Sequence, residues 1–262
     1  MYVNCMIFRC LFIVSPRSNF IHIQPGIKAT FELRHLYYLL HTNAGYFLDH
    51  VDRIMNEDYT PTRDDYLRIR LRSGGFDFFK GTLKFHELGQ ETEWQAQFID
   101  FDGGRRARNT KWRKYLSAGN TNPKTFIWVM SIADYNEKMF EDIFTFRLIE
   151  SLRAFAEFIQ YFDGCQLIVF FNKYDIFKDK IKKFPINVVF PDFPSDKDPY
   201  NEDEVARFIA FKLWSGLVRH NIKLKTVFHI HRTAAISTQN MQKVLSEIYE
   251  QIVDYNLKQK GY

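Results

Sequence analysis

The sequence predicts an α/β fold in which helices flank a mainly parallel sheet. Residues 125–133 and 167–171 are continuous apolar runs, which are typical of strands buried on both faces of a parallel sheet. Residues 225–231 form a third strand candidate, and residues 140–158 and 203–217 have the apolar spacing of helices. Strands that alternate with helices in this way favour a parallel sheet covered by helices.

Size and composition fit one large α/β domain with an appendage. Of the 262 residues, 46% are hydrophobic and 27 are phenylalanine, which is enough for a sizeable core. The net charge of +5 is mild and indicates only some preference for an acidic partner or an anionic membrane, without a nucleic-acid motif. Three cysteines without CxxC spacing make a disulfide framework or zinc site a poor fit, so a reducing compartment is expected.

Residues 1–22 admit three interpretations. Residues 6–14 are apolar except for Arg9, without a basic region ahead of them or a small-residue cleavage site, so a signal peptide is a poor fit. They are a buried strand, or a membrane-touching segment with Cys5 and Cys10 as acylation sites, or an artefact of how the coding sequence was assembled. With tyrosine at position 2, N-terminal myristoylation is not expected.

Residues 23–101 are expected to begin with helices and to end with strands. Residues 31–40 and 44–55 have apolar positions three and four apart, with Asn43 between them as a candidate N-cap. Pro61 predicts an extended connector. A basic loop is expected over residues 65–75, followed by two strand candidates, 75–88 and 94–101.

The strand at residues 167–171 ends in an Asn-Lys-Tyr-Asp tetrad at residues 172–175. Open α/β sheets bind ligands just beyond the carboxyl ends of their strands. The Asp175 carboxylate can accept both hydrogens that guanine presents at N1 and its 2-amino group, while the Asn172 amide and the Lys173 stem shape a slot for the base. Adenine lacks those donors, so the tetrad selects guanine.

Several ordered motifs together resemble the α subunit of heterotrimeric G proteins (Gα). The first switch of that family has the pattern D-x-L-R-x-R-x-x-T-x-G, which is matched by Asp65, Leu67, Arg68, Arg70 and Gly75, with Ser73 replacing the threonine. Further matches at family spacing are residues 46–49, 52–54 and 103–104, Trp112, and residues 134–135, 150–152, 172–175 and 256–258. The resemblance covers residues 24–262.

The resemblance implies a Ras-like P-loop GTPase-type sheet flanked by helices, with GTP or GDP and Mg²⁺ as cofactors. Arg70 would be the catalytic arginine that acts in cis, and the Ser73 hydroxyl would bind Mg²⁺. The nucleotide-binding residues would be Leu67, Arg68, Ser73, Gly103, Gly104, Asn172, Lys173 and Asp175, together with Ala235, whose backbone N–H would contact the guanine carbonyl.

The second switch departs from the family pattern D-x-G-G-Q. Residues 100–106 read D-F-D-G-G-R-R, so the glutamine that orients the attacking water is absent. Two alignments of this stretch are open, and they put either Arg105 or Gly104 in the place of the glutamine. Arginine cannot accept a hydrogen bond from water, and hydrolysis is expected to be impaired in both alignments.

The resemblance also implies partners and a location. The basic stretch at residues 105–114 around Trp112 would be the switch helix that meets effectors and the βγ dimer, and its alternative is a solvated helix face. The helix at residues 241–255, with the tail 256–262, would dock into a G-protein-coupled receptor. The protein is then expected to be cytoplasmic and peripheral at the inner face of the plasma membrane, without myristoylation.

The phosphate loop G-x-x-x-x-G-K-S/T has no match, since no Gly-Lys-Ser or Gly-Lys-Thr occurs in the sequence. Its strand is central in the family's sheet, and we expect residues 6–14 to fill that slot and to bury Arg9. The expected domains are an unassigned segment 1–22, a remnant of the Gα helical domain at 23–62, and a Ras-like domain at 63–262. Three alternatives stay open: a guanine-nucleotide switch with weak or no turnover, a nucleotide-independent interaction protein, and a fragment that does not fold.

Overall fold

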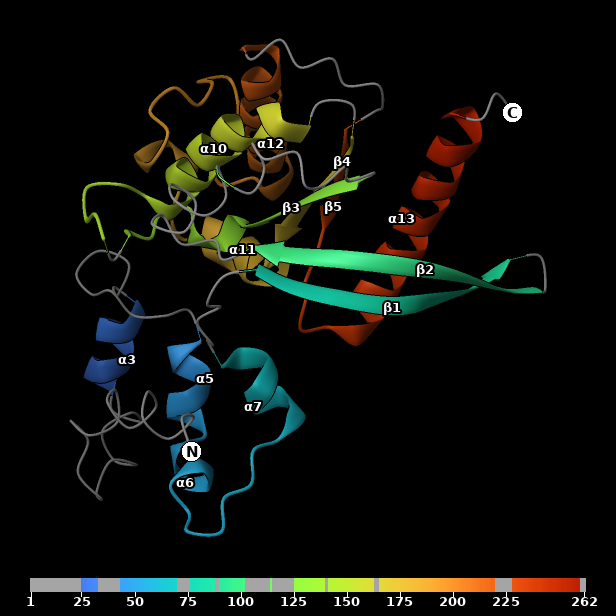
Figure 1. Cartoon of the computed structure of the whole chain (residues 1–262). Coiled ribbons are helices and arrows are strands. Elements are labelled where there is room, and N and C mark those ends of the chain that lie inside the picture. Colours follow the sequence, from blue (N-terminus) through green and yellow to red (C-terminus); the bar gives the residue numbers. More distant parts are fainter. Residues whose placement is uncertain are drawn as a thin grey trace. The chain divides into compact units, whose positions relative to one another are not determined.

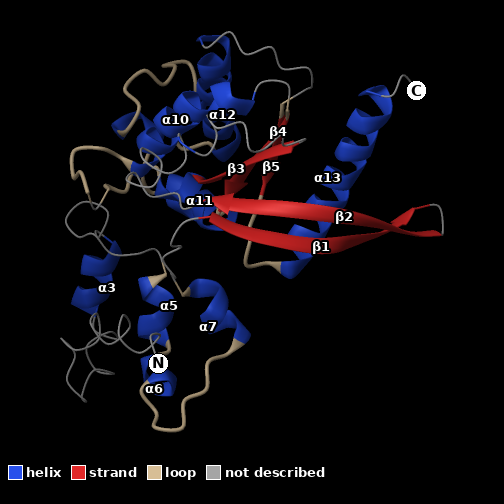
Figure 2. Cartoon of the chain, in the orientation of Figure 1, coloured by secondary structure: helices blue, strands red, loops and turns tan. Residues whose placement is uncertain are grey.

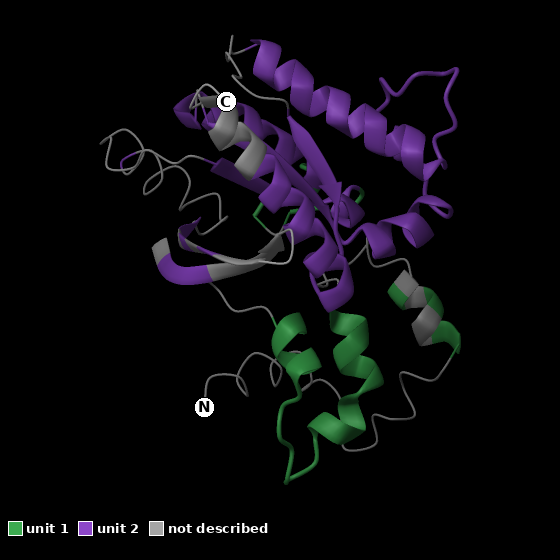
Figure 3. Ribbon diagram, turned by 90° about the vertical axis from the view of Figure 1, so that its right-hand side faces the viewer, with its two compact units in different colours: residues 1–69, 136–147 green, residues 70–135, 148–262 purple. Residues whose placement is uncertain are grey.

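The computed structural model describes residues 25–32, 43–69, 76–87, 90–101, 114, 125–139, 141–162, 165–219 and 228–259 (Figure 1). The chain divides into two compact units, residues 1–69 with 136–147 and residues 70–135 with 148–262 (Figure 3). The expected domain limits at residues 22 and 62 stay a prediction, and the expected strand at residues 6–14 lies outside the described residues.

The second unit is built on a parallel sheet of three strands in the order β3-β4-β5 (Figure 2). The strands are β3 (Thr125–Ser131), β4 (Gln166–Asn172) and β5 (His229–Arg232). β3 pairs with β4 along its whole length, from Thr125 opposite Gln166 to Ser131 opposite Asn172. The predicted strands at 125–133 and 167–171 are thus confirmed, with β3 two residues shorter at its end. The expected burial on both faces holds for β4 but is wrong for β3, whose Ile127 and Val129 are exposed.

The two faces of this sheet are covered by different helices. Ile168 and Phe170 of β4 share one face and form a core cluster with Val244 and Ile248 of α13 (Thr238–Gln259). On the other face, Trp128 meets Phe155 of α10 (Arg147–Phe158) edge to face, and Phe126 stacks on Phe162 of the short helix η3 (Ile159–Phe162). β4 is therefore buried on both sides.

The expectation of a helix from residue 140 is wrong, because α10 begins at Arg147. The Asp142 side chain accepts hydrogen bonds from the Phe144 N–H and the Thr145 hydroxyl, which is typical of a turn rather than a helix interior. The buried residues of α10 are Leu148, Glu150, Ala154, Phe155 and Phe158.

The rest of the second unit consists of helices around the sheet and a separate hairpin. The helices are α11 (Tyr174–Ile181) and α12 (Glu202–Arg219), with the short helices η2 (Ile132–Asp134) and η4 (Ile186–Val188). The hairpin pairs β1 (Phe76–Glu87) with β2 (Gln90–Phe101) in antiparallel register, which confirms the two strand candidates. Among the described strands, neither β1 nor β2 pairs with the three-stranded sheet.

Four short helices lie in the part of the first unit that the structure describes: α3 (Pro25–Glu32), α5 (Ala44–Asp49), α6 (Val51–Ile54) and α7 (Arg63–Arg68). The predicted helix at 44–55 is broken at His50, whose φ of −111° and ψ of 18° leave the helical region. The predicted basic loop is wrong over residues 65–68, which are helical because Thr62 and Asp65 form a capping box. Asn43 occupies the N-cap position but makes no capping bond.

None of the helices in these described ranges is long and apolar enough to span a bilayer.

Candidate functional site

The tetrad residues gather where β4 ends, next to the loop that follows β5. Asn172 is the last residue of β4, and Asp175 lies in the first turn of α11. β5 is the parallel neighbour of β4, so the loop that carries Ala235 leaves the sheet at the same edge. The structure therefore brings together four of the predicted nucleotide-binding residues: Asn172, Lys173, Asp175 and Ala235.

The Asn172 amide is fixed by the loop after β5. Its Oδ1 accepts hydrogen bonds from the Ala235 N–H at 3.0 Å and from the Thr233 hydroxyl at 3.3 Å. Both donors contact the Oδ1 atom, so the Nδ2 group of the amide points away from them. Its two hydrogens are therefore left for a ligand. Asn172 can thus donate to an acceptor on a ligand. The Ala235 N–H, expected to contact a guanine carbonyl, here donates to Asn172.

The Asp175 carboxylate is exposed, and no other described residue bonds to it or pairs with it. A carboxylate that accepts two parallel N–H donors matches the N1 and 2-amino edge of guanine. The Asn172 donor and the Asp175 acceptor are the first and last of four consecutive residues. This donor and acceptor set fits the guanine base.

Lys173 links the tetrad to the end of β3. Its φ of 57° is the only positive value found at a non-glycine residue in the described ranges, and it costs about 1–2 kcal/mol. Its ammonium lies 3.3 Å from the buried Asp134 carboxylate, and the nearby Lys180 ammonium donates to the Ala133 carbonyl at 2.9 Å. These contacts tie α11 to η2 and hold the turn in its strained conformation.

The loop after β5 is held by hydrogen bonds to β4, α11 and α13. The Thr233 N–H donates to the Phe171 carbonyl at 2.9 Å, and the Tyr174 N–H donates to the Thr233 carbonyl at 3.0 Å. The Asn240 side chain at the start of α13 accepts from the Ala234 N–H at 2.8 Å. Burial raises the pKa of the Tyr174 hydroxyl to about 12, so it stays neutral beside Arg232.

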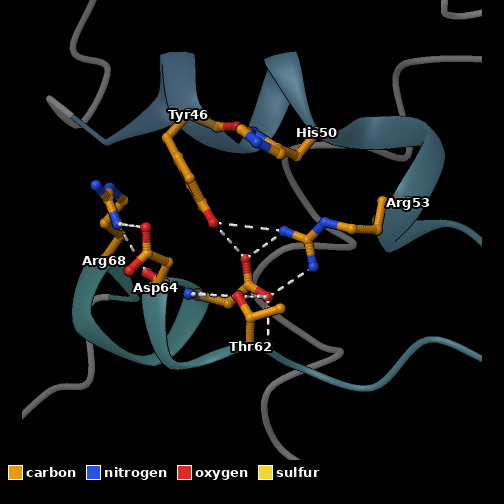
Figure 4. A network of polar contacts seen from close by, with 7 residues as sticks. Tyr46, His50, Arg53, Thr62, Asp64 and Arg68 are labelled. Carbon is orange, nitrogen blue, oxygen red and sulfur yellow. Dashed lines mark hydrogen bonds and ion pairs between the residues drawn. The ribbon is translucent and has the colours of Figure 1, made fainter.

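The first unit contains a buried carboxylate, that of Asp65, with five hydrogen-bond donors. Figure 4 shows the network of polar contacts around it. Arg53 reaches both oxygens of Asp65, at 2.6 and 2.8 Å, and the Tyr46 hydroxyl donates at 2.8 Å. The Thr62 N–H and hydroxyl donate at 2.6 and 2.8 Å. Arg53 is the main reason why the pKa of Asp65 lies far below its ordinary value. This cluster anchors α7, which precedes the arginine-rich segment.

Arg68 has structural contacts in this unit. Its guanidinium lies 4.4 Å from the centre of the Tyr46 ring and 3.0 Å from the Asp64 carboxylate. Its backbone carbonyl accepts from the Asn43 amide at 2.6 Å. Leu67, beside it on α7, is exposed. Their predicted role in nucleotide binding stays a prediction.

Arg70, Ser73, Gly103 and Gly104 lie outside the described residues. The same holds for residues 260–262 and for the expected switch helix at residues 105–114, except residue 114. Among the described residues, no group of three His, Cys, Asp or Glu side chains could hold a metal ion. Ser73 therefore stays a predicted Mg²⁺ ligand.

The family model for the G-protein alpha subunit matches residues 18–252. The guanine nucleotide-binding protein alpha-2 subunit of Caenorhabditis briggsae is 33% identical over 84% of this chain and 56% of its own length. The alpha-17 subunit of Caenorhabditis elegans is 31% identical over 95% of this chain and 65% of its own length. The alpha-4 subunit of Dictyostelium discoideum is 29% identical over 89% and 62%, respectively. The chain thus spans 56–65% of the length of these relatives, and it belongs to the G-protein alpha subunit family.

Proposed function

We propose that this chain is a Gα-type signal transducer that binds guanine nucleotides weakly, mainly through the base. The observation that carries the proposal is the end of β4, where Asn172 is oriented by Thr233 and Ala235 and the Asp175 carboxylate is exposed. This edge offers one donor group and one acceptor group to a ligand, and guanine is the base with the matching pattern.

The weak affinity in this proposal follows from the lack of a loop that binds the phosphates. Phosphate groups need several backbone N–H donors and a lysine near a helix N-terminus, and the 262-residue sequence holds no phosphate-loop motif. Losing about four charge-assisted hydrogen bonds at roughly 1.5–3 kcal/mol each removes about 6–12 kcal/mol. Because 1.4 kcal/mol is a factor of ten, a site of nanomolar affinity would become one of about tens of micromolar or weaker.

In this proposal Arg70 supplies positive charge to the phosphates, Ser73 binds Mg²⁺, and Gly103 and Gly104 contact the nucleotide. Without a glutamine to orient water, hydrolysis is slow or absent.

The test is a titration of the full chain with a fluorescent GTP analogue in Mg²⁺, followed by competition with GTP, GDP, guanosine and ATP. We expect GTP, GDP and guanosine to compete within about tenfold of one another and ATP not to compete. Submicromolar affinity, or a large preference for GTP over guanosine, would contradict the base-dominated site.

Two matched variants test whether the guanine base binds at Asp175. Asp175→Asn replaces a carboxylate acceptor with an amide that can donate. The variant should therefore lose its affinity for guanine and favour xanthine, which has a carbonyl at the carbon that bears the 2-amino group of guanine. Asp179→Asn changes another exposed carboxylate of α11 and should leave binding unchanged. Equal effects of the two variants would place the base elsewhere.

The second candidate is an interaction protein that works without nucleotide, and one surface favours it. Phe211, Trp214 and Val218 are spaced along α12 on one exposed side. The partners in either case would be a βγ dimer, a receptor through the C-terminal helix and an effector through the switch helix, at the inner face of the plasma membrane.

A pull-down with βγ in the presence and absence of GTP distinguishes the two candidates. Retention that depends on nucleotide supports the switch, whereas equal retention supports the interaction protein. Failure to retain βγ, receptor and effector at micromolar protein concentration would contradict both signalling roles.

A further inference from the structure

Arg232, the last residue of β5, connects the loop that follows this strand with the tetrad turn. Its backbone is the parallel partner of Phe171 on β4, one residue before Asn172. Its guanidinium lies 4.9 Å from the centre of the Tyr174 ring, and Tyr174 is the third residue of the tetrad. Arg232 therefore contacts the tetrad turn through its side chain, while its backbone leads directly into the loop at Thr233.

The Tyr174 side chain depends on contacts with its ring. Its hydroxyl is buried, and no described residue forms a hydrogen bond with it. The ring contacts Phe177 at a centroid distance of 5.5 Å and the Arg232 guanidinium. Phe177 lies on α11, as Tyr174 does. Of these two ring contacts, only the one with Arg232 joins the start of α11 to β5.

The Arg232 guanidinium is itself held by α12. Its Nη2 atom lies 2.6 Å from the carboxylate of Asp203, in the first turn of that helix. The two side chains are 46% and 47% exposed, so the ion pair contributes little to stability but fixes the direction of the guanidinium. One side chain thus bridges β5, α11 and α12.

This bridge is connected to both groups that would read the base. The Tyr174 N–H donates to the Thr233 carbonyl at 3.0 Å, and the Thr233 hydroxyl donates to Oδ1 of Asn172 at 3.3 Å. Tyr174 also directly precedes Asp175, so a shift of Tyr174 changes the position of the Asp175 carboxylate. The Asn172 donor and the Asp175 acceptor therefore both depend on where Tyr174 lies.

We propose that Arg232 is a positioning residue of the base site, which acts through Tyr174 to keep Asn172 and Asp175 at the spacing that guanine requires. This inference rests on the proposed function, because it concerns the same site. In this role Arg232 does not touch the base. It orders the site before the ligand arrives, and such ordering raises affinity because less conformational freedom is lost on binding. A contact between a partly exposed cation and an aromatic ring changes an equilibrium by about two- to fivefold.

Competition of guanosine and inosine for the full chain tests the positioning role. Inosine lacks the 2-amino group, so the ratio of the two affinities reports how well Asp175 is placed. Arg232→Met removes the charge and should lower this ratio by about two- to fivefold. Arg232→Lys keeps a cation near the ring and should change the ratio by less than about 1.5-fold. The control is Arg207→Met, which removes an exposed arginine of α12 and should leave the ratio unchanged.

The ratio separates positioning from a general loss of stability. A variant that is merely less folded offers fewer binding sites, but each remaining site keeps the native preference for guanosine over inosine. An unchanged ratio in Arg232→Met would therefore overturn the positioning role, and so would an equal fall in Arg232→Lys, since the lysine keeps the charge.

Hydrogen exchange without nucleotide tests the contact separately. The amides of Tyr174 and Ala235 donate to groups of the loop and of the tetrad. Arg232→Met should therefore speed their exchange by about two- to fivefold relative to the control variant. Unchanged exchange of both amides would overturn the inference even if guanosine binds. A native chain that binds no guanosine would instead contradict the proposed function, and the positioning role would fall with it.

Discussion

Replacing Asp65 by asparagine tests the carboxylate cluster of the first unit. The substitution keeps the shape of the side chain but removes the charge that Arg53 contacts at 2.6 and 2.8 Å. Removing one partner of a buried ion pair costs about 3–5 kcal/mol. The Arg53 side chain is 36% exposed and regains water, so we reduce the expected loss to about 1.5–3 kcal/mol.

The assay is hydrogen exchange of the α7 amides, which reports local opening. A loss of about 1.5–3 kcal/mol corresponds to exchange that is roughly 10- to 150-fold faster, at 1.4 kcal/mol for each factor of ten. Asp64→Asn is the control, because Asp64 neighbours Asp65 on the same helix but forms an exposed pair with Arg68. It should change exchange by less than about threefold.

The same cluster makes a prediction about pH. The pKa of Asp65 is depressed in the folded chain, so its contribution to stability is present above the unfolded value of about 3.9 and is lost as the pH falls below it. The difference in α7 amide exchange between the native chain and Asp65→Asn should therefore be full at pH 7 and should shrink below about pH 4. Equal exchange in Asp65→Asn and Asp64→Asn at pH 7 would refute the reasoning.

Two further predictions concern the face of the sheet that α13 covers. Ile248→Ala should lower the free energy of unfolding by about 2–4 kcal/mol, whereas Leu245→Ala on the same helix should cost less than about 0.5 kcal/mol, since the two side chains are 5% and 49% exposed. Urea titration measures both, and similar losses would contradict the packing of α13. Burial is the main cause that lowers the pKa of His229, and the neighbouring His231 is the second. The contribution of His229 to stability is therefore full above about pH 6.5 and is lost as the pH falls below that value. His229→Gln should flatten the decline in urea midpoint between about pH 7 and 5, and an unchanged decline would count against this origin.

The sequence predicted the sheet better than the helices, for a physical reason. β4 is a continuous apolar run because it is buried on both faces, and such a run is visible without knowledge of its partners. β3 is an equally apolar run, although Ile127 and Val129 on one of its faces are exposed.

The start of α10 was predicted too early, at residue 140, because the Asp142 side chain bonds locally and forms a turn, so the helix begins only at Arg147. The Thr62 and Asp65 capping pair is visible in the sequence and indicates the start of α7. The segment was nevertheless predicted to be a loop because of the arginines that follow.

The candidate site was predictable only where its residues are adjacent in sequence. Asn172 and Asp175 belong to one tetrad that follows a buried strand. Thr233, which orients the Asn172 amide, is 61 residues away and becomes its neighbour only because β5 pairs with β4. Asn240 was unremarkable in the sequence, since an asparagine near a helix start has many local uses.

The central place of β4 also constrains how the chain folds. Its partners begin 41 residues before it and lie about 61 residues after it, so both pairings close long loops. Parallel pairings of this separation slow folding, because the entropy of loop closure is lost before the contacts form. During synthesis β4 can pair with β3 early, but its second edge has no partner until β5 has left the ribosome. The nascent chain therefore presents an apolar strand edge for the time needed to make about 60 residues, roughly 3–12 s at 5–20 residues per second.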